Sequence, residues 1–292
     1  MSPLEVLHPH QKDLGGGFVV RRSLPAAQRQ AVGPFVFFDH FGPITARPGD
    51  NHDVRPHPHI GLATVTYLFE GAMMHRDSTG VVQRIEPGAV NLMTAGRGIV
   101  HSERTPKDLL GHERRSHGLQ LWLAVPAERE EDVPSFQHVP GNEIPALEID
   151  GVLVRVLIGS AFGLTSPVRT LSPTLYLDLN FGVASGASLA VPAAAEERAL
   201  YSTDHDFELD GELVPALAMV VLEAGAEPVL SAPRGDRIVV VGGAPLGHRF
   251  MVWNFVSSRK ERIVEAQADW EAQRFERVPG ETEFIPLPPR HP

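Results

Sequence analysis

Two pairs of potential metal ligands, each with one residue between its members, carry the clearest chemical signal in this sequence. His57 and His59 lie in the run Arg-Pro-His-Pro-His, and His101 and Glu103 lie further along in His-Ser-Glu. In an extended strand the side chains of residues i and i+2 point to the same face. Each pair can therefore aim at one point. Three imidazoles and one carboxylate that converge make a ligand set for one divalent first-row metal ion.

Each pair alone is a weak signal, because a His-Pro-His run can also lie in a surface turn without any ligand. The two pairs together, on either side of an apolar and strand-rich segment, are much more specific. Pro56 and Pro58 add to this, since they fix φ on both sides of His57 and pre-organise the strand. The ligand set suits iron, manganese, nickel, copper or zinc, so the sequence leaves the native metal open.

The elements that must position these residues read mainly as strands. Short runs rich in β-branched, aromatic or alternating apolar residues, bounded by turn residues, predict strands at 63–69, 119–125, 152–158, 175–181, 218–222 and 237–241. Such a pattern favours a sandwich or a barrel. One helix is expected over 259–275, with Ser258 and Glu261 as a capping box and with Ile263, Ala266 and Trp270 on its packed face.

An internal repeat predicts two domains. Residues 86–98 align without gaps with residues 223–235, and six of the 13 positions are identical. At this offset of 137 residues, Ile238 and Val240 take the places of His101 and Glu103. Eleven of the 14 histidines lie between His8 and His138. We therefore expect a second copy that keeps the scaffold without the metal ligands, joined to the first by a surface connection over 126–149.

Composition limits the classes of function. The chain has 292 residues, a formal net charge of −10 and no cysteine, which excludes disulfides, thiolate metal sites and cysteine nucleophiles. This acidity argues against direct binding of nucleic acid. Neither a membrane span nor a secretory signal is evident, so we expect a cytoplasmic protein that does not bind membranes.

Four motifs together resemble the pirin family of the cupin superfamily, and the similarity runs from about residue 17 to about residue 269. They are Phe35-Val-Phe-Phe-Asp-His-Phe-Gly42, Arg55-Pro-His-Pro-His-Ile-Gly61, Met93-Thr-Ala-Gly-Arg-Gly-Ile-Val-His-Ser-Glu103 and Gly118-Leu-Gln-Leu-Trp122. The resemblance implies an all-β bicupin: two β-barrels of the double-stranded β-helix type and a C-terminal helix. It implies a metal-binding cupin domain at 1–130 and a metal-free cupin domain at 131–292 that carries the helix. Pirins hold one iron on three histidines and a glutamate, which here would be His57, His59, His101 and Glu103.

Two functions follow from this resemblance. Some pirins are similar to quercetin 2,3-dioxygenases, so our first hypothesis is an Fe(II)-dependent dioxygenase that opens a flavonol ring with O₂. Glu103 would then also act as the general base. The alternative is a non-enzymatic iron-binding regulator that acts through a protein partner. A bicupin with an empty, relic site is the third reading. In each case a monomer is expected.

Several further residues carry expectations that the structure can check. The chain departs from the cupin pattern at 60–64, where no carboxylate follows His59, and this removes an acid near the metal. His40 is expected to make a structural hydrogen bond. His75 is expected either near the metal on a loop or a neighbouring strand, or, as the preferred expectation, at the surface. Both His112 and His117 are expected in a solvated loop. Segments containing Phe35, Phe37, Leu121 and Leu123 are expected to line the cavity near the metal.

Overall fold

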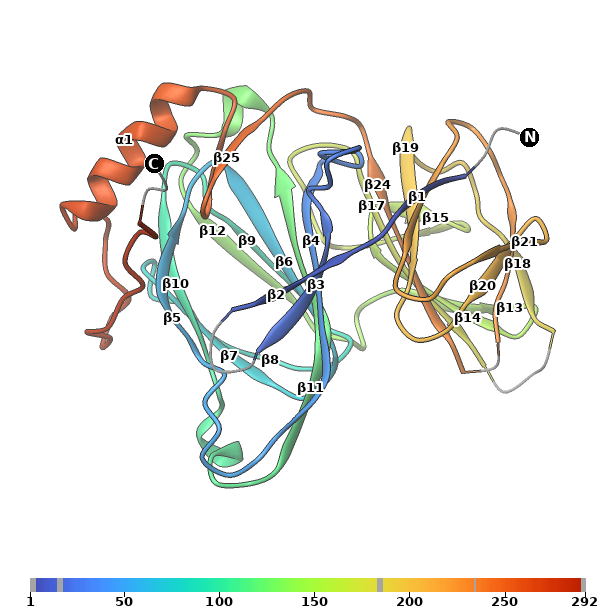
Figure 1. Cartoon of the computed structure of the whole chain (residues 1–292), viewed down its shortest axis with the longest axis horizontal. Coiled ribbons are helices and arrows are strands. Elements are labelled where there is room, and N and C mark those ends of the chain that lie inside the picture. Colours follow the sequence, from blue (N-terminus) through green and yellow to red (C-terminus); the bar gives the residue numbers. More distant parts are fainter. Residues whose placement is uncertain (1–3, 15–17, 183–185, 234, 290–292) are drawn as a thin grey trace. The chain divides into compact units, whose positions relative to one another are not determined.

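The computed structural model describes residues 4–14, 18–182, 186–233 and 235–289 (Figure 1). Its contacts divide the chain into two compact units, each assembled from three segments. The histidine unit, which contains the His57 and His101 motifs, consists of Asp13–Val20, Phe41–His138 and Gly247–Pro292. The apolar unit consists of Met1–Lys12, Arg21–His40 and Val139–Leu246. The predicted domains, 1–130 and 131–292, are each one continuous segment of the chain and are not the same divisions as these two units. They stay a proposal.

The motifs of the histidine unit lie on two antiparallel sheets. The larger sheet has the order β12 (Ser135–Val139), β9 (Val90–Thr94), β6 (Leu62–Glu70), β11 (Arg114–Ala124), β4 (Phe35–Ala46), β3 (Val19–Leu24) and β2 (His10–Asp13). The smaller sheet has the order β5 (Val54–His59), β10 (Ile99–Arg104), β7 (Met73–Asp77) and β8 (Val82–Ile85). Both histidine motifs therefore lie on neighbouring strands of the smaller sheet.

The apolar unit repeats this arrangement. Its larger sheet has the order β1 (Glu5–Leu7), β22 (Met219–Leu222), β19 (Glu197–Ser202), β24 (Arg237–Gly243), β17 (Thr174–Phe181), β14 (Val152–Ile158) and β13 (Ala146–Ile149). Its smaller sheet has the order β18 (Ser188–Ala190), β23 (Val229–Ser231), β20 (Phe207–Leu209) and β21 (Glu212–Val214). The predicted all-β fold with two similar units of strands is confirmed. The predicted strands also appear, with ends that differ by a few residues.

The remaining elements are short. Two hairpins pair β15 (Ser160–Ala161) with β16 (Leu164–Thr165) and β25 (Phe250–Val252) with β26 (Phe255–Ser257). Two 3₁₀ turns span Lys107–Leu109 and Ala127–Arg129, and the helix α1 spans Lys260–Glu271.

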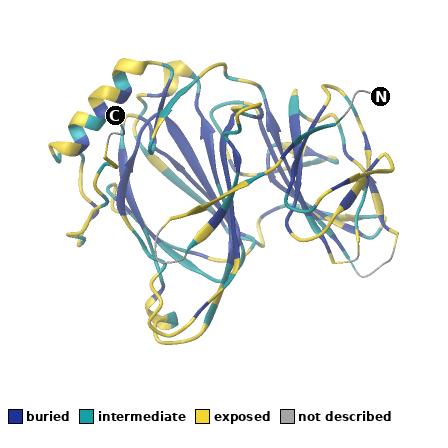
Figure 2. Cartoon of the chain, viewed as in Figure 1, coloured by how far each residue is buried: buried dark blue, intermediate teal, exposed yellow. Residues whose placement is uncertain are grey.

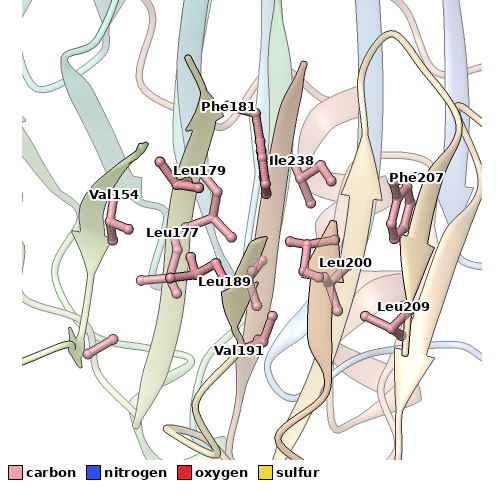
Figure 3. Packing of buried hydrophobic residues seen from close by; sticks show 14 of the residues in the cluster. Val154, Leu177, Leu179, Phe181, Leu189, Val191, Leu200, Phe207, Leu209 and Ile238 are labelled. Carbon is pink, nitrogen blue, oxygen red and sulfur yellow. The ribbon is translucent and has the colours of Figure 1, made fainter. Parts of the chain in front are cut away.

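The core of the apolar unit is a cluster of buried apolar side chains. Along β17 the alternate residues Leu175, Leu177, Leu179 and Phe181 all enter one buried cluster, as the period of two predicts. Figure 3 shows part of this cluster, with side chains from several strands meeting between the two sheets. Hydrophobic burial on this scale is the main source of stability in such a unit.

The strand orders correct the predicted alignment of the repeat. In the smaller sheets, β10 lies between β5 and β7, and β23 lies in the same way between β18 and β20. The counterpart of β10 is therefore β23, whereas the offset of 137 residues placed His101 opposite Ile238 on β24. Leu230 on β23 pairs with Leu189 on β18 as His101 pairs with His57. Both leucines lie in the buried cluster.

Helix α1 packs on the histidine unit. Ile263, Ala266 and Trp270 are its buried residues, as the helical spacing predicts, and its other side is exposed (Figure 2). They share a cluster with Ile60 and Val100, which neighbour His59 and His101 in the sequence. The predicted capping box is wrong, because the N-terminus of α1 has no side-chain cap. Ser258 instead donates to the carboxylate of Glu130 through both its backbone N–H and its hydroxyl.

Candidate metal centre

The antiparallel pairing of β5 with β10 brings the two histidine motifs together. His57 lies directly opposite His101, and His59 lies opposite Ile99. Residues that face each other across such a pair point to the same side of the sheet. Beyond His101 the register shifts, so that Glu103 faces Val54. This bulge falls at Arg55 and Pro56, where a proline that cannot donate a ladder hydrogen bond is tolerated.

The three imidazoles form one buried group. His57, His59 and His101 are 7%, 1% and 2% exposed, and their candidate ligand atoms lie within 4.8 Å of one another. The Nε2 atoms of His59 and His101 are 3.1 Å apart. Two nitrogens bound at about 2.1 Å to one metal ion with a right angle between them would be roughly 3.0 Å apart. The spacing of these two nitrogens therefore fits a shared metal ion.

Hydrogen bonds to the backbone fix which nitrogen of His57 and His59 is free to bind. Nδ1 of His57 lies 2.9 Å from the carbonyl oxygen of Arg55, and Nδ1 of His59 lies 3.0 Å from that of Asn254. A carbonyl oxygen only accepts, so each Nδ1 must carry the proton, and the Nε2 lone pair is left for a metal. Among the described residues, this donor set matches what one first-row metal ion requires.

Burial also keeps these rings neutral. It lowers the pKa of His57 to about 4 and lowers the pKa values of His59 and His101 well below the ordinary value. The positive charge of one ring also disfavours charge on its neighbours. At neutral pH all three imidazoles therefore present unprotonated ligand atoms, and a metal ion does not have to displace a proton from them.

Glu103 shares the face of His101 but is not in the group of ligand atoms within 4.8 Å. On the β7 side the strand is regular, with His101 opposite Asp77 and Glu103 opposite His75. Partial burial raises the pKa of Glu103 to about 7. A nearby metal cation would favour the charged carboxylate. The assignment of Glu103 as the fourth ligand stays a prediction.

The surroundings of the centre differ from the sequence-based expectations. Trp122 on β11 lies against His59, with ring centroids 5.1 Å apart. Because side chains alternate along a strand, Leu121 and Leu123 point to the other face of β11 and not toward the centre. Phe35 and Phe37 lie on β4, in residues that the contacts assign to the apolar unit, and a role for their segment at the cavity stays a prediction. Trp122 is therefore the wall residue that the sequence interpretation missed.

Four other histidines can now be placed. His40 makes the expected structural hydrogen bond, 2.8 Å from the hydroxyl of Tyr201, and His112 is exposed as expected. Of the two positions considered for His75, the preferred one at the surface is wrong, since it is 3% exposed and lies against His101 on the neighbouring strand β7. The prediction of a solvated loop for His117 is also wrong, since it lies on β11 and is 6% exposed.

On the other face of β10, two side chains form hydrogen bonds with the segment that follows α1. Ser102 and Arg104, which alternate with His101 and Glu103, both donate hydrogen bonds to the carboxylate of Glu281. Burial alone would raise the pKa of Glu281. The bonds from Arg104 and Ser102 and the charge of Arg104 outweigh this, so the pKa lies below its ordinary value.

Replacing Glu281 by glutamine is expected to lower the free energy of unfolding by about 1 kcal/mol at pH 7, as for a partly exposed ion pair. The native carboxylate has a depressed pKa, so its contribution is full above the unfolded pKa near 4.5. It is lost as the pH falls through the folded value. The stabilities of the two proteins should therefore converge as the pH falls from 4.5 through the folded pKa of Glu281, measured by urea unfolding across a pH series. The matched control is Glu283→Gln, because Glu283 also binds Arg104 but is 57% exposed. A difference between wild type and Glu281→Gln that did not narrow at all as the pH falls below 4.5 would contradict this account.

No helix in the described part of the chain has the length and apolar character needed to cross a membrane.

Comparison with known proteins agrees with this architecture. The family model described as Pirin matches residues 17–123, and the Pirin C-terminal cupin domain matches residues 176–276. A pirin-like protein of Caulobacter vibrioides is 46% identical over 288 residues, which cover 97% of this chain and 98% of the relative. Pirin of Homo sapiens is 34% identical and covers 94% of each chain. The crystal structure of a quercetin 2,3-dioxygenase from Acinetobacter baumannii has a TM-score of 0.91 and 35% identity, covering 99% of this chain and 96% of that one. The chain therefore belongs to the pirin family.

Proposed function

We propose that this protein is a metal-dependent dioxygenase that opens the ring of a flavonol such as quercetin with O₂. The observation that carries the proposal is the buried group of three neutral imidazoles with ligand atoms within 4.8 Å of one another. It is supported by the similarity to a structure titled quercetin 2,3-dioxygenase. We propose Fe(II) as the native metal, although other first-row metals suit the same ligands.

The chain would hold the metal through Nε2 of His59 and His101, through His57 and through the carboxylate of Glu103. When bound, the metal would supply Lewis-acid and redox chemistry for the reaction of the flavonol with O₂. We propose Glu103 also as the general base that takes the proton from the flavonol hydroxyl. Beside the metal cation this carboxylate would be charged at neutral pH and could accept that proton.

The remaining residues would orient the substrate and exclude water. The flat indole of Trp122 lies edge-on to His59 and offers an apolar surface for an aromatic ring. The centre lies on strands whose inward residues are buried, so few waters would compete with the substrate.

The direct test loads metal-free protein anaerobically with Fe(II), adds quercetin and then admits air. We expect loss of the flavonol absorbance together with consumption of O₂, and neither in metal-free protein or in His101→Ala. No turnover with iron demonstrably bound would reject the dioxygenase. It would favour the alternative, an iron-binding regulator that acts through a protein partner, and binding partners would then be sought with the iron-loaded protein.

A further inference from the structure

A chain of hydrogen bonds leads from His101 to a buried carboxylate that is outside the ligand set. Strand β7 is the neighbour of β10 on the side away from β5, and its Asp77 lies directly opposite His101. His75 lies two residues before Asp77 and therefore shares its face. Both are buried, with His75 3% exposed and Asp77 fully covered. Two further chemical groups thus lie behind the metal centre.

The contacts connect these groups in order. Nε2 of His75 lies 3.0 Å from Oδ2 of Asp77, and Nδ1 of His75 lies 3.4 Å from Nδ1 of His101. The other oxygen of Asp77 accepts hydrogen bonds from the backbone N–H and the hydroxyl of Thr79, at 2.9 and 2.7 Å, and from the backbone N–H of Val81 at 3.2 Å. Burial raises the pKa of Asp77, but the bonds from His75 and Thr79 outweigh it and the pKa is lowered. Asp77 therefore stays an acceptor at neutral pH.

These contacts allow two arrangements of protons for neutral rings, and metal binding selects one of them. The carboxylate of Asp77 only accepts, so Nε2 of His75 carries the proton, and Nδ1 of His75 has a free lone pair. Nε2 of His59 also has a free lone pair, 3.1 Å from Nε2 of His101. The single proton of His101 can therefore lie on Nε2, toward His59, or on Nδ1, toward His75. Only the second arrangement leaves Nε2 of His101 free for a metal, and the contact with His75 stabilises it.

We propose that His75 and Asp77 are positioning residues that fix the tautomer and the ring orientation of the metal ligand His101. His57 and His59 are fixed by backbone carbonyls, whereas His101 depends on two side chains, so its ligand strength can be altered by substitution. The inference rests on the proposed metal site. Partners of this kind behind a ligand typically change metal affinity by about 10–100-fold when they are removed.

A purely structural role for His75 has to be separated from this one. Its ring stacks on Phe136, with centroids 4.5 Å apart and planes 22° apart. His75→Phe keeps an aromatic ring for this stacking but has no acceptor for His101. His75→Asn loses the ring but places an amide oxygen near the position of Nδ1. If His75 acts by positioning His101, His75→Asn should bind metal more tightly than His75→Phe. If His75 acts by packing alone, the order of the two affinities should be reversed.

Two variants test the far end of the chain. Asp77→Asn keeps an oxygen for the turn, but its amide N–H₂ cannot accept from His75. His75 must then reverse its tautomer, and its Nδ1–H would point at Nδ1 of His101. The control Thr79→Val removes one bond to Asp77 on the side away from His75. It perturbs the same turn without affecting the proton on His75.

The first measurement is the state of the Nδ1–H group of His101 in the Zn(II)-loaded protein, from ¹⁵N–¹H correlations of the histidine rings. In the wild type and in Thr79→Val we expect a proton signal that is shifted downfield and protected from exchange with solvent, as in a hydrogen bond to His75. In His75→Phe and Asp77→Asn we expect this signal to move upfield or to exchange with solvent. A signal that is unchanged in His75→Phe would overturn the proposal. Because Zn(II) has no redox chemistry, this result is independent of whether the protein is a dioxygenase.

The second measurement is the Kd for Co(II), by competition with a chromogenic chelator. We expect the Kd to rise about 10–100-fold in His75→Phe and Asp77→Asn, and to stay within a few-fold of wild type in His75→Asn and Thr79→Val. Wild-type affinity in His75→Phe together with weak binding in His75→Asn would assign His75 to packing alone and reject the proposal. Unchanged affinity in Asp77→Asn would reject the role of Asp77.

Discussion

Replacing His101 by alanine is expected to abolish metal binding. His101 is the histidine that lies closest to both of the others, with its ring centroid 4.3 Å from that of His57 and 5.0 Å from that of His59. Removal of a group behind a ligand already weakens metal affinity by up to about 100-fold, so loss of the ligand itself should exceed that. The measurement is the metal content per chain after loading and dialysis, together with the Kd for Co(II).

The matched control is His205→Ala. His205 lies in the apolar unit, and its side chain is 55% exposed beside Asp236. This variant should keep the metal content of the wild type, since it touches neither β5 nor β10. Full occupancy in His101→Ala would show that the ligands have been wrongly assigned, provided that the near-ultraviolet circular dichroism shows both variants folded.

Replacing Glu130 by alanine is expected to cause the largest loss of stability, about 3–5 kcal/mol in the free energy of unfolding, as when one partner of a buried ion pair is removed. The carboxylate of Glu130 lies 3.0 Å from Nε of Arg249, and the two side chains are 2% and 6% exposed. It also accepts from the hydroxyl of Ser257 and the backbone N–H of Ser258, each at 2.8 Å. The substitution leaves a buried guanidinium without the charge that compensates it. Urea unfolding at pH 7 measures the loss.

Glu131→Ala is a sharp control because it changes the adjacent residue. Glu131 pairs with Arg259 and Arg262 at 3.0 Å each, but its side chain is 46% exposed. Exposed pairs contribute at most about 1 kcal/mol. Equal losses in the two variants would refute the importance of burial at Glu130. Since Glu130 anchors the end of the hairpin that carries Asn254, metal affinity should also fall in Glu130→Ala and not in Glu131→Ala.

The part of the centre that the sequence predicts is the part determined by local spacing. The alternation of side chains along a strand is enough to place His57 with His59, and His101 with Glu103, whatever the rest of the fold does. The family resemblance then supplies the pairing of the two strands. In the same way, the alternation of apolar residues along β17 predicts which of its side chains enter the buried cluster.

His75 shows where this reasoning was not carried far enough. The run Met74-His75-Arg76-Asp77 contains a His-x-Asp pair with the same i, i+2 spacing as the ligand pairs. That signal was available, but its meaning depends on the pairing of β7 with β10, which spacing alone does not give. The hydrogen bond from His59 to Asn254 joins residues 195 positions apart, and nothing in the local sequence predicts it.

Two other predictions failed for reasons that local sequence does not contain. Ser258 has the type and spacing of a helix cap, yet it binds the buried carboxylate of Glu130, because an unpaired charge there would cost more than an uncapped exposed helix end. The offset of the repeat failed because a gap-free alignment cannot follow loops of different length. Only the strand order identifies β23 as the counterpart of β10.

The bond between His59 and the carbonyl of Asn254 also bears on the order of events during synthesis. A nascent chain already contains all three histidines once residue 101 has been made, but it lacks the group that fixes the ring of His59. The 153 residues from His101 to Asn254 take roughly 8–30 s to translate at about 5–20 residues per second. For that interval the histidines are present without their final geometry, and they are free to take up whichever metal the ribosome's surroundings offer. Selective loading is therefore expected to follow release of the finished chain.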